Sequence, residues 1–233
     1  MSENLIVAID GPAGSGKSTS AKLVAQKLGY LYIDTGSMYR AVTFIAMRDK
    51  IIDNIPAIVD LAKNANIILD FVDGDTKVYL NGEDLTEEIR SHEVNVNVSF
   101  VSTIEGVRNT LVKKQQEMGS TGSGVVMEGR DIATAVFPNA DVKIFLTASI
   151  DQRAERRLKE YEDKGKHISL LEIKENLSYR DNLDSTRGIN PLMKTPDAVE
   201  VDTSLVSIDD QVNMILNEVE RVAKIKGISV NLS

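Results

Sequence analysis

Short apolar runs alternate along this chain with segments whose apolar residues recur every three or four positions. A short run of consecutive apolar residues is typical of a strand buried on both faces, and the longer spacing is typical of an amphipathic helix. We therefore expect core strands at residues 5–10, 31–34, 125–128, 142–146 and 198–201. We expect helices at residues 18–28, 37–48, 107–118, 151–163 and 208–223. This order predicts an α/β fold in which a five-stranded parallel sheet is covered by helices.

The ends of the expected helices carry residues that stabilise helix termini. Gly29 follows the first helix and suits the left-handed conformation that often closes a helix. Ser149 and Ser207 each precede a helix, with Gln152 and Asp210 three residues further on. A serine followed at this distance by an amide or acidic side chain is a typical helix start. These signals support three of the expected helices.

Residues 66–85 interrupt the alternation of strands and helices. We expect three further strands there, at 66–71, 77–80 and 83–85, the first two joined by residues 72–76. Asn81 and Gly82 are typical of a two-residue hairpin turn, because both favour positive φ. A small antiparallel sheet is therefore inserted between the second and third core strands. It is either a substrate-binding lobe or a decorative insertion.

A second irregular region, residues 153–196, is rich in charge and contains glycine and proline. Its arginines are Arg153, Arg156, Arg157, Arg180 and Arg187. A solvated, charged helical face is one explanation of such a segment. The expected topology places these arginines beside a phosphate site, so a mobile lid over a nucleotide is the other.

Composition narrows the classes of protein that the chain can represent. The 42% hydrophobic and 27% charged residues are ordinary for a soluble globular protein, and we expect a cytoplasmic one without a membrane span. The chain has no cysteine, which excludes disulfides and thiolate metal sites. A net charge of −8 argues against a general nucleic-acid surface. His92 and His167 lack partners at metal-ligand spacing, so we expect surface roles for both.

The segment GPAGSGKST, residues 11–19, follows the first expected strand and leads into the first expected helix. Its glycines allow the backbone to curl so that N–H groups point inward at phosphate oxygens. Lys17 can reach the β- and γ-phosphates of a nucleotide, and the Ser18 hydroxyl can ligate Mg²⁺. A structural glycine turn with a chance lysine is the alternative. The strand–loop–helix context favours a phosphate-binding P-loop.

Two further clusters follow core strands. Residues 34–40, DTGSMYR, place a hydroxyl, backbone N–H groups and an arginine at the end of the second strand. Ligands of open α/β sheets bind at this edge. At the third strand, Glu128 is positioned to orient Mg²⁺ through water, and Arg130 and Asp131 project over the expected cleft.

Together these segments resemble the bacterial cytidylate kinase family. The matching segments are GPAGSGKST, DTGSMYR, VMEGRDIAT, FPNADVKIFLTAS, RAERR and RDNLDSTRGINPL, in the family's order and over nearly the whole chain. The resemblance implies a single domain over residues 1–233. Its parts are a core (1–62, 100–152 and 190–233), a monophosphate-binding insert (about 63–99) and an arginine-bearing lid (about 153–189). Glu128 departs from the family pattern, in which we expect aspartate.

The resemblance also implies an activity and a set of site residues. The family transfers the γ-phosphoryl group of ATP to CMP or dCMP with Mg²⁺ as cofactor, giving ADP and CDP or dCDP in pyrimidine nucleotide metabolism. The implied catalytic residues are Lys17, Arg130, Arg180 and Arg187. The implied ATP-binding residues are Gly11, Pro12, Ala13, Gly14, Ser15, Gly16, Lys17, Ser18, Thr19, Arg153 and Arg157, with Ser18 as metal ligand. The implied CMP-binding residues are Thr35, Arg40, Ser99, Arg108, Arg130, Asp131, Asp184 and Arg187.

The chemistry of these residue types agrees with that assignment. Asp131 can accept a hydrogen bond from the cytosine amino group, while Arg108 and Ser99 can donate to its other edge atoms. Uracil presents an oxygen where cytosine presents the amino group. A pocket that hydrogen-bonds cytosine would therefore leave polar groups unpaired when uracil binds. Phosphoryl transfer needs positioning and cations more than a general base. We expect a monomer whose partners are ATP and CMP or dCMP. A kinase for another acceptor such as UMP and a regulatory P-loop ATPase are the alternatives.

Overall fold

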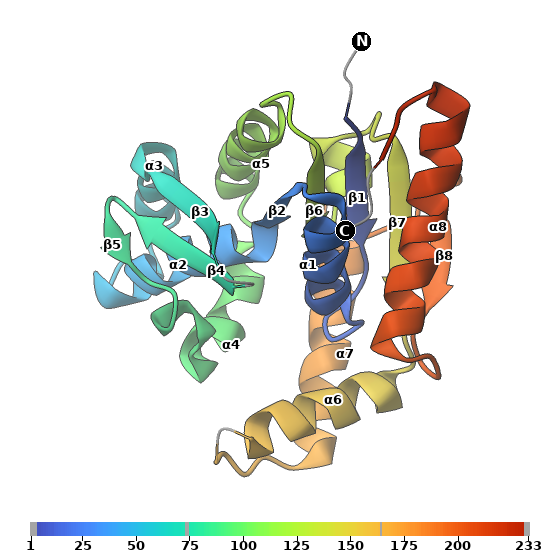
Figure 1. The fold of residues 1–233 in the computed structure, drawn as a ribbon. Coiled ribbons are helices and arrows are strands. Elements are labelled where there is room, and N and C mark those ends of the chain that lie inside the picture. Colours follow the sequence, from blue (N-terminus) through green and yellow to red (C-terminus); the bar gives the residue numbers. More distant parts are fainter. Residues whose placement is uncertain (1–3, 73–74, 164, 231–233) are drawn as a thin grey trace.

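The protein, described by a computed structural model over residues 4–72, 75–163 and 165–230, is built around the expected parallel sheet (Figure 1). Its five strands lie in the order β2-β6-β1-β7-β8 and are all parallel. They are β1 (Ile6–Asp10), β2 (Leu31–Asp34), β6 (Val125–Gly129), β7 (Val142–Thr147) and β8 (Val199–Asp202). The α/β prediction is confirmed, with strand ends that shift by one residue at most.

Helices cover both faces of the sheet because successive strand residues point to opposite sides. In β1, Val7 and Ile9 join the cluster formed with α1 (Lys17–Leu28) and α8 (Ile208–Lys226). Ala8 between them joins the opposite cluster, which includes residues of α5 (Glu105–Gly119) and of the short helical turn η2 (Ile132–Val136). The short, continuous apolar runs expected from the sequence are thus explained by burial on both faces.

The predicted helix ends are present. Gly29 closes α1 with φ 63°, and its N–H donates to the Ala25 carbonyl. Ser149 caps the start of α6 (Ile150–Glu162), and Ser207 caps the start of α8. The helix α2 (Thr35–Arg48) begins two residues before the expected position, because the Asp34 side chain accepts from the Ser37 N–H and caps it. Among the described residues, no helix is both long and apolar enough to cross a membrane.

The insert contains the expected antiparallel sheet, with strand order β3-β4-β5. Its strands are β3 (Ile67–Val72), β4 (Asp75–Leu80) and β5 (Glu83–Asp84). Asn81 and Gly82 have φ of 52° and 86°, as the predicted hairpin turn requires. The expected connection over 72–76 contains residues 73 and 74, which lie outside the described residues. This sheet packs into one apolar cluster with α2, α3 (Ile55–Asn64) and α4 (His92–Val101), the last preceded by η1 (Glu88–Arg90).

The region predicted as a lid is a pair of packed helices, α6 and α7 (Leu170–Thr186). Ile173 and Leu177 of α7 pack with Ala154 of α6 and with Ala13 of the P-loop. In Figure 1 the pair lies below the C-terminal ends of the core strands, and the insert projects to the left of the sheet. Three helices, α3, α4 and α7, were not among those expected from the sequence.

Candidate active site

A cleft of about 600 Å³ opens at the C-terminal ends of the core strands, bounded by the P-loop, the insert and the lid helices. The P-loop runs from the end of β1 into α1. Gly11 has φ 152°, and a Cβ at this position would collide with the Leu146 carbonyl oxygen of β7. Gly16, the residue before α1, has φ 91°. Only glycine fits the backbone at these two positions, which explains how the loop can curl tightly between β1 and α1.

Lys17 lies buried at the base of the cleft and is only 5% exposed. Its Nζ donates to the Pro12 carbonyl oxygen at 2.7 Å. Burial and the neighbouring Arg130 guanidinium lower the pKa of Lys17 to about 7. A bound phosphate would stabilise the charged form, so the ammonium group is prepared for an anionic ligand.

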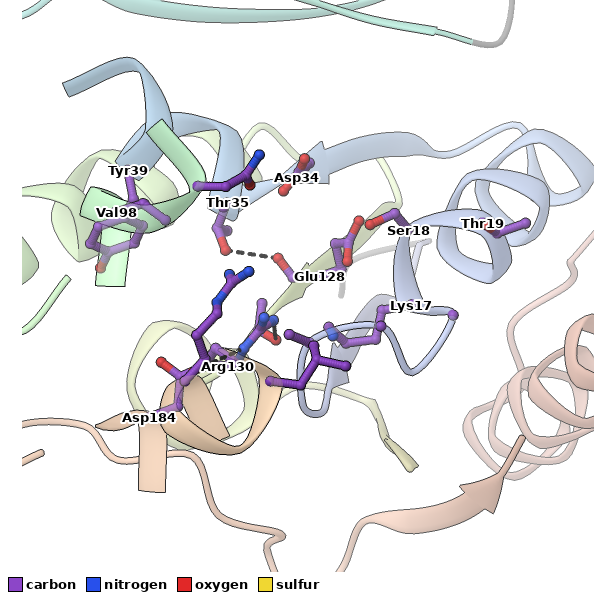
Figure 2. Close-up of a pocket in the computed structure, with 18 of the residues that line it drawn as sticks. Lys17, Ser18, Thr19, Asp34, Thr35, Tyr39, Val98, Glu128, Arg130 and Asp184 are labelled. Atoms are coloured by element: carbon purple, nitrogen blue, oxygen red, sulfur yellow. Dashed lines mark hydrogen bonds and ion pairs between the residues drawn. The ribbon is translucent and has the colours of Figure 1, made fainter. Parts of the chain in front are cut away.

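Acidic groups gather beside Ser18 at the end of β2 and β6. Figure 2 shows the Glu128 carboxylate and the Ser18 hydroxyl directed toward one another. Burial and the neighbouring Asp34 raise the pKa of Glu128. The described residues include no cluster of three or more metal-ligating side chains. Mg²⁺ in nucleotide sites needs none, because it keeps several waters and binds one or two protein oxygens together with phosphates. The hard oxygens of Ser18, Glu128 and Asp34 fit that ion.

Three arginines meet around Asp184 on the other side of the cleft. The Arg130 Nε donates to Asp184 Oδ2 at 2.9 Å, and the Arg187 Nη1 donates to Asp184 Oδ1 at 3.2 Å. Burial and Arg130 lower the pKa of Arg180 to about 10. Arg180 Nε and Arg187 Nη2 are buried without a hydrogen-bond partner among the described residues. Buried cationic N–H groups without partners are costly unless an anion completes them.

Arg40 lies at the opposite wall, on the first turns of α2. Its Nη2 donates to Asp34 Oδ2 at 2.6 Å and to the Ser37 hydroxyl at 2.9 Å. The Thr35 hydroxyl donates to the Glu128 carbonyl oxygen at 2.8 Å, which ties α2 to β6 (Figure 2). These contacts fix the side chains on the α2 wall of the cleft.

A polar pocket lies at the insert end of the cleft, around a buried ion pair. The Arg108 Nη2 donates to Asp131 Oδ2 at 2.5 Å, and its Nη1 donates to the Ser102 carbonyl oxygen at 3.0 Å. The guanidinium also lies 5.4 Å from the centre of the Tyr39 ring. Ser99 lies beside this pair in the lining of the cleft. Donors and an acceptor therefore line the same end of the cleft.

Most of the site residues expected from the sequence line this one cleft. Those that line it are Ala13, Gly14, Gly16, Lys17, Ser18, Thr19, Thr35, Arg40, Ser99, Arg108, Arg130, Asp131, Arg157, Arg180, Asp184 and Arg187. Those outside its lining are Gly11, Pro12, Ser15 and Arg153. The first three are backbone positions of the P-loop. Their assignment to ATP stays a prediction, like the roles of the others.

Arg153 has a different setting from the one expected of an ATP-binding lid residue. It is 6% exposed, and its Nη1 donates to the Ala13 carbonyl oxygen at 3.1 Å. Its Nε donates to the Ala148 carbonyl oxygen at 3.0 Å, and its Nη1 lies 2.7 Å from Asp181 Oδ2. Arg153 thus fastens both lid helices to the P-loop, and Arg156, which was not assigned, lines the cleft in its place.

Several residues that shape the site were missed in the sequence. Asp34 and Tyr39 lie within the quoted DTGSMYR segment, but nothing in the segment distinguished the cap and the ring from their neighbours. Asp10 ends β1 and accepts the N–H groups of Ile132 and Ala133 at 2.9 and 2.8 Å. Its burial raises its pKa to about 6. A carboxylate directly before a P-loop was the available signal for this residue.

Comparison with known sequences gives one consistent result. A family model described as Cytidylate kinase matches residues 7–221. A protein named cytidylate kinase from Bacillus velezensis is 47% identical over 225 residues, covering 96% of this chain and 100% of the relative. A cytidylate kinase from Bacillus subtilis is 45% identical over 225 residues, again covering 96% of this chain and 100% of the relative.

Solved structures agree at the level of the fold. An uncharacterised protein from Eubacterium ventriosum has a TM-score of 0.54 at 14% identity, covering 94% of this chain and 99% of that one. A gluconokinase from Sinorhizobium meliloti has a TM-score of 0.50 at 16% identity, covering 97% of this chain and 96% of that one. The architecture is therefore one that recurs in proteins of very different sequence.

Proposed function

This chain belongs to the cytidylate kinase family, and we propose that its cleft binds ATP at the P-loop end and CMP or dCMP at the insert end. The protein is an ATP-dependent nucleoside monophosphate kinase that transfers the γ-phosphoryl group of ATP to CMP or dCMP. The products are ADP and CDP or dCDP. The relatives named above are cytidylate kinases rather than UMP kinases or regulatory ATPases, so family membership favours neither alternative.

The observation that carries the assignment of the cleft is the convergence of cations on one cavity. Its cationic lining includes Lys17, Arg40, Arg130, Arg180 and Arg187. Two buried guanidinium nitrogens there, Arg180 Nε and Arg187 Nη2, make no hydrogen bond with the described residues, which supports the binding of oxyanions between them. The transferred phosphoryl group carries charge over three oxygens in its transition state, and preorganised cations stabilise it.

In the proposed arrangement each cation has a separate task. Lys17 exchanges the Pro12 carbonyl oxygen for the β- and γ-phosphates of ATP. Arg130 and Arg187 hold the phosphate of CMP together with Thr35 and Arg40, and Arg180 spans donor and acceptor phosphates. The attacking oxygen belongs to a CMP phosphate that is already an anion, so no general base is required. Positioning and charge compensation therefore supply most of the rate.

The remaining assignments concern metal, base and ribose. When bound with ATP, Mg²⁺ supplies neutralisation of charge between the β- and γ-phosphates. Ser18 would hold the ion, and Glu128 would order its water shell. Asp131, Arg108 and Ser99 read the cytosine edge, and Asp184 contacts the ribose. A monomer that acts in the cytoplasm is our further expectation, which light scattering and cell fractionation test.

A coupled assay of ADP release tests the proposal directly. ADP release from ATP should be fast with CMP or dCMP, slow with UMP and far slower with ATP alone. Closure of the lid excludes the water that would otherwise take the phosphoryl group. Equal ADP release with and without every monophosphate would instead identify a regulatory ATPase.

A further inference from the structure

Tyr32 connects the insert to the acidic side chain beside the P-loop. It lies in β2 and is 1% exposed, and its hydroxyl donates to Glu128 Oε1 at 2.5 Å. Its ring meets the ring of Phe71 in β3 edge-on, with centroids 5.2 Å apart and planes at 63°. The ring therefore has a fixed orientation, which directs the hydroxyl at one carboxylate oxygen.

The length of the Glu128 side chain explains why a hydrogen-bond partner is needed to fix its carboxylate. Its side chain is one methylene longer than that of the aspartate expected at this position, so it has one more torsion to fix. Glu128 is 3% exposed, and its carboxylate faces Ser18 (Figure 2). The bond to Tyr32 engages Oε1 and thereby restricts the rotation of the carboxylate beside Ser18.

We propose that Tyr32 is a positioning residue for the metal site. It fixes the Glu128 carboxylate in the rotamer that orders the water shell of nucleotide-bound Mg²⁺ next to Ser18. This inference rests on the proposed function, which gives Glu128 that task. Groups that orient a metal-site side chain by hydrogen bonding typically change metal affinity or activity by about 10- to 100-fold when removed.

The substitution Tyr32→Phe tests the role, because it removes the hydroxyl and keeps the ring against Phe71. Mn²⁺ serves as the probe, and its affinity for the enzyme–ADP complex is measured by water-proton relaxation, without turnover. We expect Mn²⁺ to bind roughly tenfold more weakly. In the kinase assay, the Mg²⁺ concentration for half-maximal rate should rise by a similar factor, while the KM for CMP stays unchanged.

Tyr30→Phe is the matched control. It removes a phenol two residues away, whose oxygen accepts from the Leu5 N–H at 3.4 Å and which is absent from the cleft lining. Its Mn²⁺ affinity and Mg²⁺ requirement should equal those of the unmodified protein. Thermal unfolding of both variants shows that each measurement is made on folded protein.

The substitution Glu128→Gln separates failure of this inference from failure of the proposed function. It should weaken Mn²⁺ binding by itself, and Tyr32→Phe should then have no additional effect. If Glu128→Gln weakens binding but Tyr32→Phe does not, Tyr32 has no positioning role and the function of Glu128 stands. If Tyr32→Phe weakens binding equally in both backgrounds, it acts independently of Glu128 and the inference is wrong. If Glu128→Gln leaves Mn²⁺ affinity unchanged, the metal role of Glu128 fails, and this inference fails with it.

Discussion

Burial of the Lys17 ammonium group destabilises the free protein, because only the Pro12 carbonyl oxygen and, at 3.4 Å, the Ser15 hydroxyl accept its hydrogen bonds among the described residues. In the Lys17→Ala variant we expect kcat to fall by about 10²–10⁵-fold, since a preorganised cation on the transferred phosphate is lost. The unfolding temperature should not decrease, because a buried charge is removed. Turnover is measured by ADP release and stability by thermal unfolding. A folded variant with near-normal turnover would contradict the P-loop assignment.

The lowered pKa of Lys17, about 7, makes nucleotide binding depend on pH. Above that pH the free protein increasingly holds a neutral lysine, while bound phosphates restore the proton. ADP affinity should therefore fall as pH rises from 6 to 9, by at most about tenfold per pH unit, and binding should take up a proton. Calorimetry in two buffers of different ionisation enthalpy measures that proton. The uptake should disappear in Lys17→Ala, and identical heats in both buffers for the unmodified protein would exclude the linkage.

Asp131 and Arg108 form a buried pair, so a variant of either tests stability as well as specificity. Asp131→Ala leaves Arg108 buried and unpaired, which should cost about 3–5 kcal/mol of stability. It should also reduce kcat/KM for CMP more than for UMP, because the acceptor for the cytosine amino group is lost. Thermal unfolding measures the loss of stability, and kcat/KM for CMP and UMP measures the change in specificity. An unchanged CMP-to-UMP ratio would leave Asp131 as only the structural partner of Arg108.

For single residues, the sequence predicted which side chains gather at the site better than it predicted the direction in which each side chain points. Lys17, Arg130 and Asp131 lie in short motifs whose backbone path is fixed by the strand ends, so their convergence was predictable. Arg153 and Arg156 lie one turn apart on α6, and the sequence contains no signal that tells which of them is buried and which lines the cleft. The structure turns Arg153 inward to the Ala13 carbonyl and places Arg156 in the cleft lining.

We expect the lid helices α6 and α7 to become more protected when nucleotides bind, except at the point where α6 is attached to the P-loop. Arg153 binds the P-loop backbone, whereas Arg157 and Arg180 line the cleft. Hydrogen exchange of residues 157–187 should therefore slow when an ATP analogue and CMP bind together. The first turn of α6 should change little, because Arg153 already anchors it. Unaltered exchange in 157–187 with both ligands would show that these helices are not a lid.

Helices and strands were predictable from the sequence where burial gives their apolar residues a single clear spacing. The core strands and the helices that cover them have unambiguous apolar patterns, and the Asn81–Gly82 turn has its own signal. The helix α4 has no such helical pattern, because residues 94–98 alternate valine and asparagine in the two-residue period typical of a strand. The Ser91 side chain caps its start, and packing against α2 makes it helical. In α7, Ile173 and Leu177 are the buried apolar positions, too few in a charged segment to predict a helix.

Taken as a whole, the molecule carries a net charge of −8 and yet concentrates cations in one cleft. Nucleotides are anions, so their attraction to the cleft opposes repulsion by the remaining surface. We expect kcat/KM for CMP to fall roughly 3- to 10-fold between 0.05 and 0.5 M salt as screening shortens the reach of the cleft charges. Sodium and potassium acetate should act alike. If kcat/KM does not change with salt concentration, the negative surface charge cancels the attraction of the cleft, and the prediction is wrong.

The order of the strands also bears on how proteins of this architecture diversify. Asp34 at the end of β2 pairs in register with Glu128 of β6, although the entire insert lies between them in the chain. The connection leaves the sheet at Asp34 and re-enters it at Val125 of the neighbouring strand, which lies in register with Leu31 at the other end of β2. Exchange of the segment between these two points would replace the insert together with α2 and α5, and would leave the P-loop in place. The same junctions offer a route to chimeric kinases with new acceptor specificities.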